Sequence, residues 1–305
     1  MVSRKGKVMV TMEKIAEKTY RLEVPLPDIY WLTTVYLINE GRGVVVEPGP
    51  AAAIPSIKEA MKELGMKEEL DYIIPTHIHM DHAGGMGGLA QLFPQAKVVL
   101  HPLSVKHAVD PSRWVESTRL SFGDDFEVRY GAILPVPESQ IKIIADGETI
   151  SVGGRELQVI YTPGHAPHHI AIFDRETGGL FCGEALGLPM PWAESSPLPT
   201  AAPPAFDPEV YLGTMKRLRK LSPRFLGYSH DGVGREPEEL ISRAEENTKI
   251  WGDMVLNALR EGDDIEAIVK RVREYIYHRF GVTAEQIDRM TLEGYIFYFK
   301  KNGLV

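Results

Sequence analysis

Residues 71–82 read DYIIPTHIHMDH. The apolar start predicts a short buried strand, and the proline predicts the turn that ends it. Beyond that turn, His77 and His79 can project to the same side of the chain. The chain then curls and brings Asp81 and His82 round, so we expect four ligand atoms to converge. Because imidazole and carboxylate are the ligands that borderline divalent cations prefer, the stretch predicts a metal site at a strand end, with coordination positions left for water.

The other histidines add to this pattern, because eight of the ten fall in four short stretches. Three of them lie in TPGHAPHH at residues 162–169, His230 lies in YSHDG, and His101 ends an expected strand. Scattered surface histidines are the alternative interpretation for any one of these residues. For an HxHxDH pattern directly after an apolar strand, that alternative is disfavoured.

The rest of the chain predicts an α/β fold. Over the first 220 residues, short β-branched runs alternate with helical patterns, which implies a sandwich whose helices cover the sheet faces. The last 70 residues are helical almost throughout, so we predict a catalytic domain over 1–235 and a C-terminal helical region over 236–305. The expected strands are 19–26, 34–39, 43–47, 71–75, 97–101, 140–145, 156–161, 169–173 and 224–229. The expected helices are 52–65, 85–93, 103–109, 208–221, 236–261, 263–280 and 284–301.

The composition excludes several classes of protein and of partner. The hydrophobic share of 44% and the charged share of 25% are those of a globular protein, not of a disordered, collagenous or rod-like chain. The net charge of -8 gives no general attraction to nucleic acid or to an anionic membrane, so we expect neither partner. No run of about 18 apolar residues could span a bilayer. The N-terminus lacks the apolar core of a secretory signal, and the single cysteine, Cys182, cannot form an internal disulfide, so we expect a cytoplasmic protein.

A proline-rich segment over residues 184–208 predicts a long loop, because proline is excluded from helix interiors and central strands. The segment is not polar, as a linker would be, since it carries Leu186, Met190, Trp192 and Phe206. These side chains need a surface to pack against. We expect the loop to form a wall or lid beside a pocket, with Met190 and Trp192 as candidate substrate contacts. A plain packed connection is the alternative.

Taken together, the motifs resemble those of the metallo-β-lactamase superfamily. The HxHxDH pattern at 77–82 matches the central motif of that family, and His165 in TPGH matches its third motif. Glu184 in FCGEA stands where the family has a bridging carboxylate, and His230 matches the last histidine. These elements occur in the family's order over residues 19–235, so the match is specific as a set.

The resemblance implies a four-layered αβ/βα sandwich with the site at the sheet edges. It also implies two divalent metal ions, with zinc expected and iron or manganese as alternatives. The implied ligands are His77, His79 and His165 for the first ion, Asp81, His82 and His230 for the second, and Glu184 between them. Asp81 is also expected to act catalytically, by moving a proton from the attacking water to the leaving group.

The chain departs from the family at two positions. Glu184 is one methylene longer than the usual aspartate, so the bridge can be monodentate or displaced. His168 stands where hydrolytic members often have glycine, which leaves three interpretations open: an additional substrate contact, a hydrogen-bond donor to a metal ligand, or a solvated loop residue. We expect the neighbouring His169 to orient a ligand by hydrogen bonding. We expect Glu47, which falls where the family usually has an acidic residue, to support the site or anchor a loop, because a buried carboxylate needs partners.

Comparison with subclasses of the family reduces the number of activities that we expect for this chain. The FDPE helix at 208–221 resembles that of quorum-quenching lactonases, but Gly187 replaces a tyrosine that those enzymes carry. Glyoxalase II also has a helical C-terminal region, yet no clear glutathione-holding cluster is present here. The flavin-coupled diiron oxygen reductases alter HxHxDH and add a flavodoxin domain, and this chain does neither. Nucleic-acid-processing members carry a large inserted domain that is not visible here.

We therefore expect a dinuclear metal-dependent hydrolase that cleaves a small ester-type substrate, most simply a lactone or thioester, through a metal-bridged hydroxide. The alternative is a non-hydrolytic metal-binding or diiron redox protein on the same fold. The expected partner is a small-molecule substrate. The C-terminal helices resemble the helical or winged-helix-like tails of related hydrolases. We expect their aromatic residues to pack against the sandwich or, in a homodimer, against a second subunit.

Overall fold

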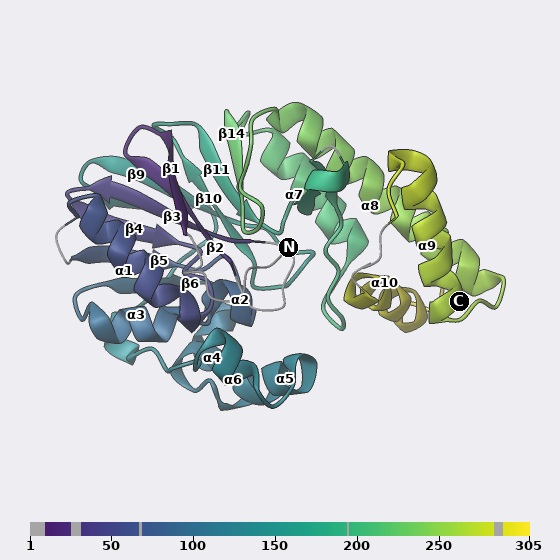
Figure 1. Cartoon of the computed structure of the whole chain (residues 1–305), viewed down its shortest axis with the longest axis horizontal. Coiled ribbons are helices and arrows are strands. Elements are labelled where there is room, and N and C mark those ends of the chain that lie inside the picture. Colours follow the sequence, from purple (N-terminus) through teal and green to yellow (C-terminus); the bar gives the residue numbers. More distant parts are fainter. Residues whose placement is uncertain (1–9, 26–31, 67–68, 194, 284–288) are drawn as a thin grey trace, which may run out of the picture.

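The structure is a computed structural model that describes residues 10–25, 32–66, 69–193, 195–283 and 289–305. Two β-sheets pack face to face, and helices cover the outer face of each sheet (Figure 1). This arrangement confirms the expected four-layered αβ/βα sandwich.

The first sheet has the strand order β1-β2-β3-β4-β5-β6-β7. Its pairing is antiparallel from β1 to β4 and parallel from β4 to β7. Several strands of this sheet therefore end at one common edge. The strands are β1 (Thr11–Ala16), β2 (Thr19–Val24), β3 (Thr33–Glu40), β4 (Arg42–Val46), β5 (Leu70–Ile74), β6 (Lys97–Leu100) and β7 (Ile141–Ile143).

The second sheet has the order β15-β14-β11-β10-β9-β8. Only β11 and β14 are parallel neighbours, and the connection between them contains a small separate hairpin and a helix. The strands are β8 (Thr149–Val152), β9 (Arg155–Tyr161), β10 (Ile170–Asp174), β11 (Gly179–Gly183), β14 (Phe225–Tyr228) and β15 (Val233–Gly234). The hairpin consists of β12 (Leu188–Met190) and β13 (Ser196–Leu198).

The helices lie outside the sheets, and the last three of them follow the final strand in the sequence. Those of the first half are α1 (Ile54–Glu63), α2 (Met80–Ala83), α3 (Met86–Leu92), α4 (Val105–Val109), α5 (Ser112–Phe122) and α6 (Phe126–Tyr130). Those of the second half are α7 (Pro208–Arg219), α8 (Pro237–Arg260), α9 (Ile265–Phe280) and α10 (Arg289–Lys301). Short 3-10 helices cover Ala51–Ala53, Pro102–Ser104, Glu138–Gln140 and Pro191–Ala193.

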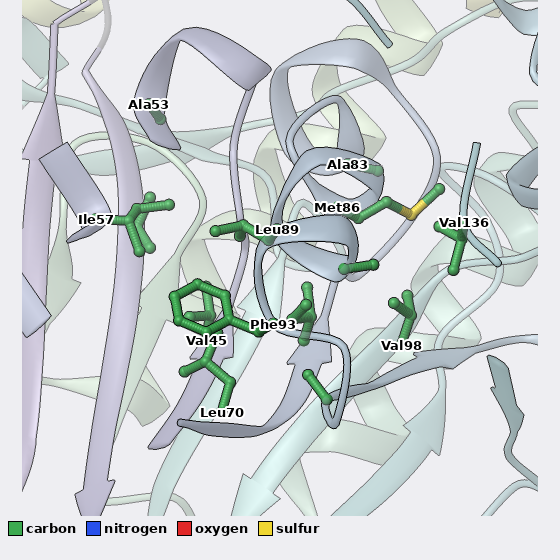
Figure 2. Close-up of a cluster of buried hydrophobic side chains, with 14 of the residues drawn as sticks. Val45, Ala53, Ile57, Leu70, Ala83, Met86, Leu89, Phe93, Val98 and Val136 are labelled. Atoms are coloured by element: carbon green, nitrogen blue, oxygen red, sulfur yellow. The ribbon is translucent and has the colours of Figure 1, made fainter. Parts of the chain in front are cut away.

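Alternation along the strands separates the interior into layers. In β4, Val44 and Val46 face the second sheet, whereas Val45 faces the helices on the outside. Figure 2 shows this outer cluster, in which Met86 and Leu89 of α3 pack over the first sheet. The outer face of the second sheet is covered in the same way by α7 and α8. Central strands such as β4 and β11 are thus fixed in register by apolar contacts on both faces.

The C-terminal region consists of three helices in its described residues, as expected for 236–305, although residues 284–288 of the expected last helix lie outside the described part.

The FDPE stretch begins a helix, as its sequence predicts. Asp207 precedes α7 and accepts hydrogen bonds from the backbone N–H groups of Glu209 and Val210, with Pro208 in the first turn. In the described part of the chain, no helix is long and apolar enough to cross a membrane.

Some elements differ from the expectations. Strands β1, β8, β11 and β15 and helices α2, α5 and α6 lie outside the expected ranges, and the proline-rich segment contains the β12–β13 hairpin where a loop was predicted. Proline is tolerated there because Pro189 and Pro197 face each other in a two-stranded ribbon, in which each strand has an unpaired outer edge.

A buried arginine joins the two sheets at the edge opposite to the histidines. The Arg155 guanidinium on β9 donates to both carboxylate oxygens of Asp174 on β10. It also donates to Thr19 at 2.7 Å and to the Glu17 carbonyl at 3.1 Å, both on the first sheet side. Arg155 is 2% exposed and Asp174 is fully buried. Removal of one partner would leave the other charge buried without compensation.

We predict that Arg155→Ala lowers the free energy of unfolding by about 3–5 kcal/mol, because Asp174 would keep its buried charge without the cation that it pairs with. The matched control is Arg175→Ala, since Arg175 lies in the next turn and forms an ion pair with Glu156 in which both side chains are half exposed. This control should leave stability nearly unchanged. Urea denaturation measures both variants, and equal midpoints for them would contradict the role given to Arg155.

Candidate metal centre

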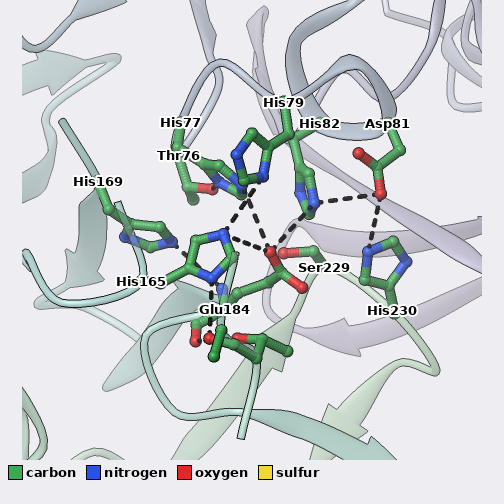
Figure 3. A network of polar contacts seen from close by, with 12 residues as sticks. Thr76, His77, His79, Asp81, His82, His165, His169, Glu184, Ser229 and His230 are labelled. Atoms are coloured by element: carbon green, nitrogen blue, oxygen red, sulfur yellow. Dashed lines mark hydrogen bonds and ion pairs between the residues drawn. The ribbon is translucent and has the colours of Figure 1, made fainter. Parts of the chain in front are cut away.

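Seven of the residues singled out from the sequence meet at one edge of the sandwich, each just after a strand. His77 and His79 follow β5, and Asp81 and His82 lie in the short helix α2 that continues the same turn. The other three residues come from the second sheet: His165 follows β9, Glu184 follows β11 and His230 follows β14. Figure 3 shows their side chains pointing toward one another. Every proposed ligand is therefore brought to the same place.

The first donor group consists of His77 Nε2, His79 Nδ1, His165 Nε2 and Glu184 Oε2, which we infer from the closest contacts. His79 Nδ1 lies 2.8 Å from His77 Nε2 and 3.3 Å from His165 Nε2. Glu184 Oε2 lies 2.9 Å from His165 Nε2 and 3.4 Å from His77 Nε2. The ligand atoms of this group all lie within 4.8 Å of one another.

Two of these rings, those of His77 and His165, form a hydrogen bond through Nδ1 on the side away from the donor group. This contact turns Nε2 toward the group. Thr76 donates its hydroxyl hydrogen to Glu47 at 2.5 Å, so its oxygen is left to accept from His77 Nδ1 at 3.0 Å. The Thr200 carbonyl can only accept, and it lies 3.1 Å from His165 Nδ1. Both rings therefore carry a hydrogen on Nδ1, so that in the neutral form each presents the lone pair of Nε2 to the group. Converging lone pairs repel one another unless a cation lies between them, so the donor set fits a divalent metal ion.

The second donor group consists of Asp81, His82 and His230. Asp81 Oδ2 lies 3.4 Å from His82 Nε2 and 3.4 Å from His230 Nε2. Glu184 Oε2 approaches this group as well, at 3.6 Å from His82 Nε2. One oxygen of Glu184 thus lies within 3.6 Å of a histidine nitrogen in each group.

Glu47 supports the site from behind, in agreement with the expectation that it needs partners. It lies at the end of β4, is 1% exposed and adopts a left-handed backbone conformation with φ 57°. One carboxylate oxygen accepts hydrogen bonds from Thr76 at 2.5 Å and from Ser229 at 2.9 Å. The other oxygen lies 3.5 Å from His82 Nδ1. Glu47 therefore orients one residue of each donor group through Thr76 and His82, and such backbone strain is typical of functional sites.

His169 holds the backbone of Glu184, as its position in the sequence predicts. Its Nε2 accepts a hydrogen bond from the Glu184 N–H at 3.2 Å, and its Nδ1 contacts the Thr162 hydroxyl at 2.6 Å. The preceding Gly183 has φ 57°, and a Cβ there would lie 2.6 Å from His169 Nε2. Glycine is required at this position because the chain both turns and passes closely over the imidazole.

The electrostatics of the site keep the carboxylates ionised and divide the imidazoles. Burial lowers the pKa of His77 and His79, whereas nearby carboxylates outweigh burial and raise the pKa of His82 and His165. Burial, reinforced by the neighbouring His165, lowers the pKa of His79 to about 4. Burial alone would keep Glu184 protonated, but His165 lowers the pKa of the Glu184 carboxyl well below its ordinary value. Asp81 behaves likewise, since His82 and His230 outweigh burial and lower its pKa. Unprotonated imidazole and ionised carboxylate are the forms that bind metal ions.

The three candidate substrate contacts, His168, Met190 and Trp192, do not all lie at the metal site. His168 lies beside the first donor group, with its ring stacked 6.4 Å from that of His77, and burial lowers its pKa to about 3. Met190 is half-buried on β12, and the side chain of Trp192 lies outside the described part of the structure. Leu186, Leu198 and Phe206 are buried in the cluster that joins the second sheet to α7 and the C-terminal helices, and Leu188 is buried as well. Most of the proline-rich segment is thus interior.

Two further residues lie near the site. Cys182 is buried, and burial raises the pKa of its thiol, so it is a core residue and not a nucleophile. The hydroxyl of Tyr211 accepts from the Gly187 N–H at 2.8 Å and donates to the Glu184 carbonyl at 2.6 Å. The sequence does not predict this contact, although Tyr211 lies in the FDPE helix, and it does not single out Thr200, which lies in no recognisable motif.

Comparison with known proteins agrees with the fold. The family model described as the metallo-beta-lactamase superfamily matches residues 30–230. The chain belongs to this superfamily. Similar members include ST1585 of Sulfurisphaera tokodaii, a metallo-beta-lactamase fold-containing protein, which is 28% identical over 69% of this chain and 76% of its own length. Its crystal structure has a TM-score of 0.62 and covers 76% of this chain and 85% of that chain.

Two further superfamily relatives extend the comparison. The structure of TTHA1429 from Thermus thermophilus has a TM-score of 0.70 and covers 95% of both chains, so the shared fold continues into the C-terminal helices; its identity is 23%. A hydroxyacylglutathione hydrolase of a Synechococcus species is 32% identical over 153 residues. That match covers 50% of this chain and 48% of the relative, so it spans about half of each.

We predict that His169→Phe weakens metal binding by about 10- to 100-fold, because the Glu184 N–H would lose the acceptor that positions it. The matched control is His101→Phe, since His101 is also a buried histidine whose ring accepts a backbone N–H, that of Leu103, but it is no part of either donor group. Competition with a chelating indicator gives the affinities. Wild-type affinity in His169→Phe, or an equal loss in the control, would show that His169 has no such role.

Proposed function

We propose that this protein is a dinuclear metal-dependent hydrolase of a small ester-type substrate. The observation that carries the proposal is the pair of donor groups that share one oxygen of Glu184. In this proposal, the first ion is held by His77, His79 and His165, the second by Asp81, His82 and His230, and Glu184 lies between the ions. We propose zinc as the metal, because four-coordinate nitrogen and oxygen sites are typical of it.

When bound, two such ions supply a water of lowered pKa and stabilise the negative charge that develops on the attacked carbonyl. The chain itself supplies the proton acceptor. Asp81 is ionised, because His82 and His230 lower its pKa against the effect of burial. Its side chain is 16% exposed at the site, the most of the second donor group. Asp81 is thus placed to take a proton and to return it to the leaving group.

The choice of substrate rests on the relatives and on the surroundings of the site. The Synechococcus relative is by name a hydrolase of an acylated glutathione, which supports a thioester. The FDPE helix, which resembles that of lactonases, supports a lactone as the second member of the same ester class. The substrate contacts that we propose are His168, Met190 and Trp192. Burial keeps His168 neutral beside the first donor group, so it can form a hydrogen bond to a substrate oxygen.

We predict that metal-loaded wild-type protein cleaves a member of a panel of thioesters, lactones, β-lactams and phosphodiesters, and that Asp81→Asn lowers turnover by about a hundredfold or more. The amide keeps the shape of the side chain but removes the charge that holds the second ion and accepts the proton. Asp71→Asn is the matched control, because Asp71 lies at the other end of β5 and pairs with exposed Arg42.

Hydrolysis rates and metal content are measured on the same samples. No cleavage of any panel member by protein that holds two ions would reject the hydrolase. Iron in the purified protein together with an oxygen-linked activity would instead support the redox alternative. Wild-type turnover in Asp81→Asn would remove the role given to that carboxylate.

A further inference from the structure

Thr200 contacts two residues of the first donor group at once. Its carbonyl accepts from His165 Nδ1 at 3.1 Å, and its hydroxyl donates to the Glu184 carbonyl at 3.3 Å. Tyr211 donates to the same carbonyl. Thr200 is buried, and it follows the β12–β13 hairpin on a segment without regular secondary structure. Since no strand or helix fixes this backbone, its position depends on what packs against it.

Helix α10 holds the residues on both sides of Thr200. The Thr291 hydroxyl accepts from the Ala201 N–H at 3.3 Å and lies 3.5 Å from the Pro199 carbonyl, to which it donates. One turn later, Gly294 packs directly on the same segment, because a Cβ there would lie 2.3 Å from the Ala201 carbonyl oxygen. Both Thr291 and Ala201 are buried. The contact between α10 and segment 199–201 is therefore close and specific.

The helix is itself anchored, so it can serve as a fixed support. The Tyr295 hydroxyl donates to the Thr248 carbonyl on α8 at 2.8 Å, and the Tyr295 ring packs at 4.8 Å on that of Phe206. At the start of the same segment, in strand β13, the Pro197 carbonyl accepts a hydrogen bond from Asn247 of α8 at 2.7 Å. The C-terminal helices thus hold segment 196–201 at both ends.

We propose that α10 is a positioning element of the metal centre, in which Thr291 and Gly294 fix Thr200 and, through it, His165 and Glu184. A continuous path of hydrogen bonds runs from Thr291 through segment 199–201 to the first donor group. The second donor group has a different support, since Glu47 contacts His82 and binds Ser229, the neighbour of His230. The C-terminal helical region therefore tunes the affinity of one ion more than that of the other. This inference rests on the metal-binding part of the proposed function and not on hydrolysis.

The test is metal affinity in variants of Thr291 in the full-length chain. Thr291→Val keeps the shape of the side chain but leaves the Ala201 N–H without its acceptor, and we expect the affinity for one of two zinc ions to fall about tenfold. Thr291→Ser keeps the hydroxyl and should retain wild-type affinity. Thr248→Val is the matched control, because the Thr248 hydroxyl is equally buried but donates only within α8, to the Ala244 carbonyl.

Two backgrounds assign the effect to one donor group. In His230→Ala, which retains the first group, Thr291→Val should weaken the binding of the remaining ion about tenfold. In His165→Ala, which retains the second group, the change should be less than twofold. Gly294→Ala, which displaces Ala201 by a different route, should give the same pattern, and cobalt spectra of these samples should shift only in the first background.

Equal affinities of Thr291→Val and wild-type protein would overturn the proposal, as would an equal loss in Thr248→Val or in both backgrounds. If Thr291→Val does not fold, the comparison rests on Gly294→Ala and Thr291→Ser. Failure of the wild-type protein to bind zinc would reject the metal centre itself, which is a separate result from an unchanged affinity in the variants.

Discussion

The arrangement of the site depends on one constraint: ring nitrogens of three histidines and a carboxylate oxygen lie within 4.8 Å of one another at the edge of the sandwich. Because the Nδ1 atoms of His77 and His165 face Thr76 and Thr200, their Nε2 atoms are turned toward His79 Nδ1. Burying polar atoms costs free energy unless each of them has a partner. A cation among these atoms would be a partner for all four at once. The supports around the site are therefore arranged about a place that suits a positive charge.

Three of the four layers of the sandwich contribute supports to that arrangement. The first sheet supplies Glu47, whose carboxylate accepts from Thr76 and Ser229 and so ties the ends of β5 and β14 together. The second sheet supplies His169, which holds the Glu184 backbone. The helices outside this sheet supply the Tyr211 hydroxyl and the contact of Thr291 with segment 199–201. A site built from strand ends is rigid because these supports come from different elements.

The sequence predicts the parts of this structure that depend on local pattern. HxHxDH follows a buried strand and folds into a turn whose ligands converge, and the Asp207–Pro208 pair begins α7 where expected. Helix α5 was not expected, because its sequence SRWVESTRLSF buries only Trp114 and Thr118 and so shows little of the apolar stripe of a long helix. The β12–β13 hairpin was missed because its prolines argue against a strand.

Other features could not be predicted because they depend on contacts between distant residues. Thr200 meets His165 across 35 residues, and Thr291 meets Ala201 across 90. Neither threonine differs in type or spacing from a surface residue, and only the packing of α10 brings them together. In contrast, Glu47 and His169 were assigned supporting roles from the sequence, because a buried carboxylate and a histidine beside a ligand each need a partner.

The central claim is that two donor groups share one oxygen of Glu184 and hold two ions. Crystals of zinc-loaded protein, measured on both sides of the zinc absorption edge, test it most directly. The account predicts two anomalous peaks, one among His77, His79 and His165 and one among Asp81, His82 and His230, with the Glu184 carboxylate between them. A single peak, or two peaks without Glu184 in contact with either, would contradict it.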